Sequence, residues 1–146
     1  MSGTKIVVGL DGSEASKRVL DVVTRQARII GDVEIIACYV IEWSPFSFQT
    51  AEENEVRHKR REEEIAQARE RVLDPALKQM RDAGLNVQGR VRHGDAADIL
   101  DRIAVDEGAS QIIIGRLGNR GLVERIFGGV SGRLIAASSV PVTIVP

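Results

Sequence analysis

Short aliphatic runs alternate along the whole chain with longer segments in which apolar residues recur every three or four positions. Such segments are typical of amphipathic helices, whereas a continuously apolar run such as Ile112 to Ile114 is typical of a parallel strand covered on both faces. The pattern predicts strands near Lys5–Leu10, Glu34–Ile41, Val87–Arg92, Gln111–Gly115 and Val142–Val145, and helices near Glu14–Ile30, Ala51–Ala83, Ala96–Glu107 and Val130–Ser138.

The alternation of strand and helix determines the expected fold class. Strands that alternate with helices are connected by right-handed βαβ crossovers, which produce a parallel sheet with helices on both faces. A chain of 146 residues fits one domain and can bury roughly 70% of its unfolded surface. We therefore expect a single Rossmann-like α/β domain that spans residues 1–146.

Three local signals refine the helices. Ser13 and Asp95 stand where N-caps are expected, directly before the first and third predicted helices. Asp74-Pro75 interrupts the long second helix, and because proline suits the first helical position, we expect a kink or break there with Asp74 as the cap of a restarted helix. The mixed charges of residues 52–64 are typical of a solvated helix face.

Two pairs of glycines predict a site for an anion. Gly115 and Gly118 follow the aliphatic strand, and Gly128 and Gly129 precede the last predicted helix. Glycines let backbone amides approach a ligand closely, and a helix N-terminus adds free amides and the positive end of the dipole. A phosphate group is the natural occupant, although a lone glycine pair is equally compatible with a hinge or a tight helix entry.

The second part of the predicted site is a turn that we expect at Asp11-Gly12-Ser13, directly after the first strand. Taken alone, these residues are what a turn with a helix cap requires. Together with the glycine spacing, however, the chain resembles the universal stress protein family. The resemblance rests on Gly115-x2-Gly118-x9-Gly128, on the opening residues 5–13 and on the closing residues 139–145. The family's nucleotide binders usually have Ser or Thr after the third glycine, where this chain has Gly129.

The resemblance implies a five-stranded parallel sheet in the order 3-2-1-4-5, with the first and fourth strands side by side. It also implies that Asp11 approaches ribose hydroxyls or a phosphate-bound metal, that the backbone near Val40 contacts adenine and that Ile114 packs against the base. The expected ligand is ATP with Mg²⁺, with AMP or cyclic AMP as alternatives. The nucleotide-binding residues expected on this basis are Leu10, Asp11, Val40, Ile114, Gly115, Gly118, Gly128, Gly129, Val130 and Ser131.

The motifs favour a binding protein over an enzyme. The chain contains no G-x-x-x-x-G-K-[ST] segment, no G-x-G-x-x-G fingerprint after the first strand and no G-x-S-x-G elbow. We therefore expect no catalytic residues and, at most, slow incidental ATP hydrolysis. The leading expectation is an ATP-binding regulatory protein of the universal stress type that supports the cellular stress response. The alternatives are a dimeric interaction module that binds no nucleotide, which the departure at Gly129 keeps open, and a weak ATPase.

The charge balance and the single cysteine limit which partners and which cellular compartment we expect for this protein. With 20 basic and 21 acidic residues, the charge gives no reason to expect a nucleic acid or a membrane surface as partner. The single Cys38 lies in an apolar run, which favours a buried, inert thiol and suits the cytoplasm. The resemblance further implies a homodimer in which two copies of Val142–Val145 pair antiparallel across a two-fold axis, besides an unidentified protein partner.

The remaining candidate functional residues give weaker signals. His93 has no other His or Cys near it in the sequence, so we expect a loop residue and not a metal ligand, and His58 lies in the charged run. Arg116 and Arg120 suit either phosphate screening or plain solvent exposure. Three aromatic residues follow the second predicted strand, and they either cover a nucleotide base or seal the edge of the core: Trp43, Phe46 and Phe48.

Overall fold

Five parallel strands, numbered along the chain, form one sheet in the order 3-2-1-4-5, as expected. The computed structural model describes residues 3–12, 14–41, 51–115 and 130–146. The sheet runs from one edge strand to the other without an antiparallel member, and all four strand pairs are parallel. The strands are β1 (Thr4–Leu10), β2 (Val33–Ile41), β3 (Asn86–His93), β4 (Gln111–Gly115) and β5 (Val142–Val145).

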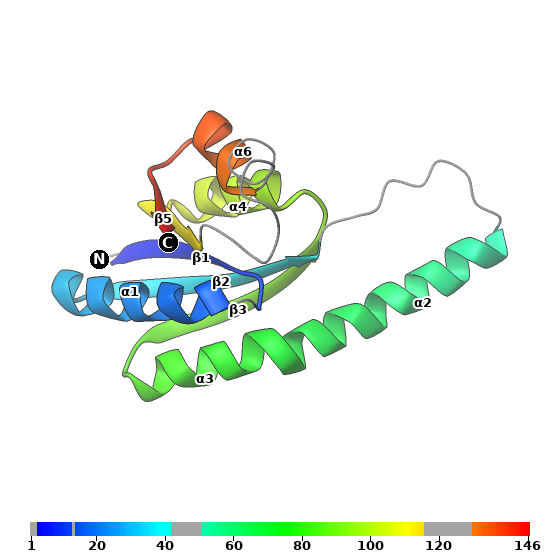
Figure 1. Cartoon of the computed structure of the whole chain (residues 1–146), viewed down its shortest axis with the longest axis horizontal. Helices are drawn as coiled ribbons and strands as arrows, with labels where there is room; N and C mark the ends of the chain where they lie inside the picture. The colour runs from blue at the N-terminus through cyan, green and yellow to red at the C-terminus, as the bar shows by residue number, and fades with distance from the viewer. Residues whose placement is uncertain (1–2, 13, 42–50, 116–129) are drawn as a thin grey trace.

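Helices cover both faces of this sheet (Figure 1). On one face lie α1 (Glu14–Ile30), a π-helical segment (Arg69–Leu73) and α3 (Asp74–Asp82), and on the other lie α4 (Ala96–Glu107) and α6 (Val130–Ala137). The long helix α2 (Ala51–Ala68) leads into the π-helical segment and extends beyond the end of the sheet. Within the described ranges, no helix combines the length and the apolarity needed to cross a membrane.

The α-helix is interrupted by the π-helical segment just before Asp74-Pro75, where we expected a kink or a break, but the expectation that Asp74 caps the restarted helix is wrong. Asp74 has helical dihedral angles, φ −60° and ψ −43°, and its N–H donates to the carbonyl of Arg69, five residues earlier. The helix therefore passes through Pro75 in a wider turn. This is a physical alternative to a break, because a proline inside an α-helix lacks one donor and collides with the carbonyl four residues before it. A π turn rearranges those carbonyls and lets the helix continue.

The cap expected at the start of α4 is confirmed. Asp95 has an extended backbone, and its carboxylate Oδ1 accepts a hydrogen bond from the N–H of Ala97 at 3.1 Å. The helix ends at Gly108 in the left-handed region, φ 67°, where glycine carries no Cβ penalty. The other expected cap, Ser13, lies outside the described residues.

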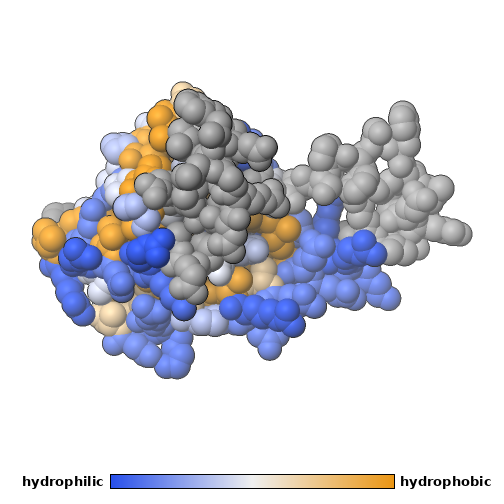
Figure 2. Space-filling model, in the orientation of Figure 1, coloured by the Kyte–Doolittle hydropathy of each residue, from blue (hydrophilic) through white to orange (hydrophobic). Residues whose placement is uncertain are grey.

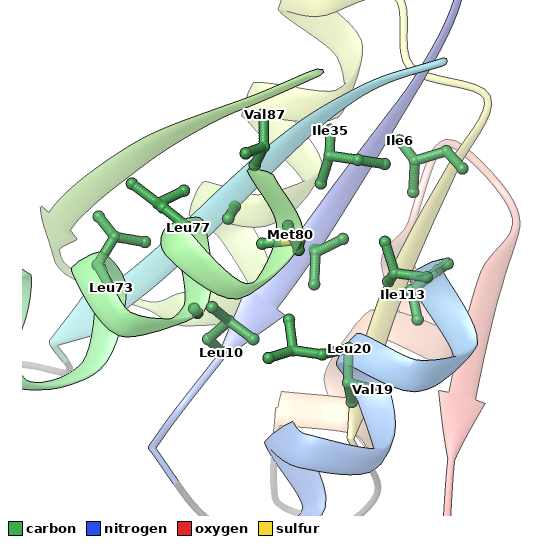
Figure 3. Packing of buried hydrophobic residues seen from close by; sticks show 14 of the residues in the cluster. Ile6, Leu10, Val19, Leu20, Ile35, Leu73, Leu77, Met80, Val87 and Ile113 are labelled. Atoms are coloured by element: carbon green, nitrogen blue, oxygen red, sulfur yellow. The ribbon is translucent and has the colours of Figure 1, made fainter. Parts of the chain in front are cut away.

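Among the residues that the structure describes, the core on the α1 and α3 face is the larger of two apolar clusters. Figure 3 shows Leu77 and Met80 of α3 beside Ile35 and Val87 of the sheet. The helix comes close because β3 has a glycine beneath it: a Cβ added at Gly89 would lie 2.8 Å from side-chain atoms of both Leu73 and Leu77. This close packing fixes the position of the π-helical segment over the sheet.

Candidate functional site

The strand order reverses between β1 and β4, and this is where open α/β sheets bind ligands beyond the carboxyl ends of the strands. The chain leaves β1 toward β2 on one side, whereas β4 lies on the other. The register places Gly9 beside Cys38 of β2 and beside Ile114 of β4. Continued by two residues, the same register brings Asp11 level with Val40. The described parts of both predicted motifs therefore meet at one edge.

The end of β1 divides its side chains between core and solvent. Leu10 is 5% exposed and belongs to the α1 and α3 cluster, so only its backbone is available to a ligand at this edge. Asp11 is exposed and begins the turn. Gly12 follows with φ +77°, and a Cβ added there would lie 3.2 Å from Cγ2 of Val72 in the π-helical segment. The turn therefore packs against the π-helical segment.

A hydroxyl that the sequence analysis missed holds Asp11. The Ser16 hydroxyl donates to Oδ1 of Asp11 at 2.9 Å and accepts a hydrogen bond from the backbone N–H of Asp11 at 3.2 Å. Ser16 lies in the first turn of α1. The available signal was a hydroxyl residue five positions after the aspartate, in the first turn of a predicted helix.

The ends of β2 and β4 supply an apolar wall. Val40 is half-buried and packs against the cluster on the α4 face. Ile114 is 4% exposed and belongs to the same cluster, and its Cγ2 lies 2.9 Å from the position that a Cβ on Gly9 would occupy. Gly115 ends β4 and pairs with Val145. Ile114 is thus packed into the protein itself, with little of its side chain exposed to a ligand.

The start of α6 lies near the start of α4. Arg133 donates to Oδ1 of Asp95 at 3.1 Å, which ties the first half of α6 to the cap of α4. Val130 is half-buried against the α4-face cluster, and Ser131 is 9% exposed. Outside the described residues lie Gly118, Gly128 and Gly129, together with Arg116, Arg120, Trp43, Phe46 and Phe48.

The expectation that His93 is a loop residue is wrong. His93 is the last residue of β3, and its Nε2 lies 3.3 Å from Oε2 of Glu64 in α2. The side chain of His93 is only 12% exposed, whereas that of Glu64 is 45% exposed. The pair connects the long helix to the carboxyl edge of the sheet. No group of three or more His, Cys, Asp or Glu side chains able to hold a metal ion occurs in the part of the chain that the structure describes.

The single cysteine of the chain, Cys38, is a free and buried thiol in β2. Cys38 is 1% exposed, and its burial raises the pKa of the thiol to about 12, against the smaller opposite effects of Arg90 and Arg92. At neutral pH the group is a protonated thiol, and the thiolate is the reactive form. The sequence-based expectation that Cys38 is buried is confirmed, and its inertness stays a prediction.

These features define a doubly wound α/β domain with its candidate site at the point where the strand order reverses. The family model of the universal stress protein family matches residues 3–146. The chain belongs to this family.

Solved structures of the same fold include members of the family. A universal stress family protein from Burkholderia pseudomallei is 26% identical, with a TM-score of 0.68, over 98% of this chain and 96% of that chain. A universal stress protein in complex with cAMP is 21% identical, with a TM-score of 0.68, over 99% and 98%. One from Archaeoglobus fulgidus in complex with dAMP is 21% identical, with a TM-score of 0.66, over 100% of both. A search of curated proteins by sequence finds no match.

Proposed function

We propose that the chain is a regulatory protein that binds an adenine nucleotide, ATP with Mg²⁺, at the carboxyl edge between β1 and β4, in support of the cellular stress response. The observation that carries the proposal is the register, which brings the Asp11 turn beside the ends of β2 and β4 at the reversal of strand order. Two family members of the same fold, the cAMP and dAMP complexes, support the choice of an adenine nucleotide.

The base and ribose occupy the part of the edge between β1, β2 and β4. Backbone groups of Leu10 and Val40 contact the ligand, because the side chain of Leu10 is directed into the core. The carboxylate of Asp11 accepts hydrogen bonds from the ribose hydroxyls, since an ionised carboxylate is an acceptor only. Ile114 forms the floor under the base through the small part of its surface that is exposed.

The phosphates occupy the space between the end of β4 and the start of α6. The N-terminal amides of α6 and the positive end of its dipole favour an anion. Mg²⁺ suits this arrangement, because it usually binds through one or two carboxylates together with phosphate oxygens, and Asp11 is an exposed carboxylate at the edge. The residues proposed to surround the phosphates are Gly115, Gly118, Gly128, Gly129, Val130 and Ser131.

The second candidate is a dimeric interaction module of the same fold that binds no nucleotide. Gly129 favours it, because the hydroxyl that the family's nucleotide binders usually carry at this position is missing. Nucleotide that is retained through purification, released by heat and identified by absorbance and mass supports the first candidate. Titration with ATP, AMP and cyclic AMP then decides which nucleotide is preferred. Phosphate release above background would be needed to support a weak ATPase.

The proposed assembly is a homodimer that pairs two copies of β5. This strand is a sheet edge, with β4 on one side. The carbonyl of Pro141 accepts from the N–H of Ile112 at 2.9 Å, and because backbone groups alternate along a strand, those of Val142 and Ile144 point away from β4. In Figure 2, hydrophobic surface gathers over α6, where Ile135 is 68% exposed, whereas the side formed by α1 and α3 is mostly hydrophilic.

A substitution that acts on the backbone of β5 tests this interface more selectively than one that introduces a charged side chain. Val142 and Ile144 pack against the α4-face cluster, so Asp at either position would damage the core as well. Ile144→Pro removes the outward backbone donor, and Ile144→Ala removes the same apolar side chain but keeps the donor. Light scattering at tens of micromolar should show a dimeric wild type, a dimeric alanine variant and a monomeric proline variant. A monomeric wild type, or a folded proline variant that stays dimeric, would remove β5 from the interface.

A further inference from the structure

The hydroxyl of Ser16 has an unusual pair of partners for a residue in the first turn of a helix. It donates to Oδ1 of Asp11 at 2.9 Å and accepts from the N–H of Asp11 at 3.2 Å. Asp11 lies before α1, which begins at Glu14. Hydroxyl groups near helix starts usually satisfy amides of the helix itself. Neither bond of Ser16 does so, which means that these two contacts order the turn and not the helix.

The turn is also supported from its other side. Gly12 has φ +77°, a conformation that L side chains rarely adopt, and Val72 of the π-helical segment lies against it. Ser16 from α1 thus holds Asp11 itself, and Val72 from the π-helical segment lies against the next residue, Gly12. A group fixed in this manner loses little conformational entropy when a ligand binds, which raises affinity.

We infer that Ser16 is a positioning residue for the nucleotide site: its hydroxyl fixes the orientation of the Asp11 carboxylate so that this group accepts hydrogen bonds from the ribose hydroxyls of the ligand. The inference rests on the proposed function. A carboxylate has roughly four lone-pair sites, so the bond from Ser16 orients the group and remains compatible with ligand bonds. Ser16 acts through Asp11 and needs no contact with the nucleotide.

The central variant is Ser16→Ala, with titration of Mg·ATP into nucleotide-free protein by calorimetry. Loss of one orienting hydrogen bond should weaken binding by about two- to tenfold. The matched control is Thr24→Ala, which removes a hydroxyl from the same helix, one that donates to the Leu20 carbonyl at 2.8 Å. This control should lower stability slightly and leave the affinity unchanged.

A double-mutant cycle separates positioning from a structural effect. If Ser16 acts through Asp11, the double variant Asp11→Ala with Ser16→Ala binds Mg·ATP no more weakly than Asp11→Ala alone. Once the Asp11 carboxylate is removed, the Ser16 hydroxyl has no group left to orient. Ser16→Thr and Ser16→Val repeat the test with side chains of equal shape, of which only threonine keeps the hydroxyl. Threonine should retain most of the affinity, and valine should match alanine. Thermal unfolding of each variant shows whether it is folded.

Two outcomes would overturn the inference while the proposed function stands. The first is a wild type that binds Mg·ATP together with a folded Ser16→Ala variant of equal affinity. The second is a double variant whose loss equals the sum of the two single losses. A wild type that binds none of ATP, AMP and cyclic AMP would instead overturn the proposed function itself, and the inference with it.

Discussion

The two faces of the sheet are sealed in different ways. On the α1 and α3 face, apolar side chains from all five strands meet one continuous cluster that includes Leu73 and Met80, both fully buried. On the opposite face, α4 lies over β1, β2 and β4, and α6 lies beside β5, whereas polar side chains lie at the end of this face formed by β3. There Glu107 of α4 accepts hydrogen bonds from Lys5 at 3.1 Å and from Arg90 of β3.

The strand β3 shows this difference most clearly, because apolar side chains pack on one of its faces and charged and polar side chains lie on the other. On the polar side, Arg90 also donates to Gln88, its neighbour but one on β3, at 3.2 Å. Arg90 pairs in register with Cys38 of β2, so the charged network lies beside a fully buried thiol. Apolar packing provides the stability of one face, and a half-buried ion-pair network closes the edge of the other.

The largest expected effect is on the apolar face. Leu73→Ala should lower the free energy of unfolding by about 2 to 5 kcal/mol, because it removes a fully buried side chain and leaves a cavity under the π-helical segment. Urea unfolding followed by circular dichroism measures the change. The control is Ile29→Ala at a position that is 81% exposed, where a change within about 0.5 kcal/mol is expected. Similar values for both variants would mean that Leu73 is not part of a close-packed core.

A smaller, pH-dependent effect is expected on the polar face. Hydrogen bonds from Arg90 and Lys5 lower the pKa of the Glu107 carboxyl. Its contribution to stability is therefore fully present above the pKa of an unfolded glutamate, about 4.3, and is lost as the pH falls through the lower folded value. Glu107→Gln should be less stable than the wild type at pH 7, and the two melting temperatures should converge in acid.

The control for this comparison is Asp106→Asn, which changes the same charge one residue away on an exposed side chain. It should show little difference from the wild type at either pH. A Glu107→Gln variant whose deficit is the same at pH 3 as at pH 7 would contradict the account, because the missing charge would then have no role.

The smallest effect concerns the thiol beneath the network. Cys38 should react very slowly with iodoacetamide at pH 8 in the folded protein, because its pKa is raised to about 12 and the group is buried, and it should react quickly in denaturant. Arg90→Ala should accelerate labelling of the folded protein without global unfolding, as measured by mass spectrometry, because the loss of cover over Cys38 outweighs the further rise of the thiol pKa when the nearby positive charge is removed. An unchanged rate would show that the apolar strands alone protect Cys38 and that the network is not part of the seal.

The strands were predictable because buried parallel strands are nearly continuous aliphatic runs, and Ile112 to Ile114 is such a run. The strand order came from the family resemblance and is confirmed. The π-helical segment was not predictable from local signals. Asp74-Pro75 suits a helix start as well as a wide turn, and the packing of Leu73 over Gly89 joins positions that no local signal connects.

Contacts between side chains far apart in sequence were equally hidden. The bond between Lys5 and Glu107 spans 102 residues and follows no periodic pattern. Asp11 was recognisable as a turn residue, but its bond to Ser16 depends on how α1 leaves the turn. Asp95 was predicted correctly, since a helix cap is a local arrangement of consecutive residues.

The central claim is that an adenine nucleotide binds where the strand order reverses. Amide chemical shifts recorded by NMR during titration with Mg·ATP test both the binding and its place. The proposal predicts saturable shifts that gather at Leu10–Gly12, Val40, Gly115 and Val130–Ser131, with little change at Gly84 and Gly108 near the opposite edge. Shifts confined to the opposite edge, or no shifts at millimolar nucleotide, would contradict it.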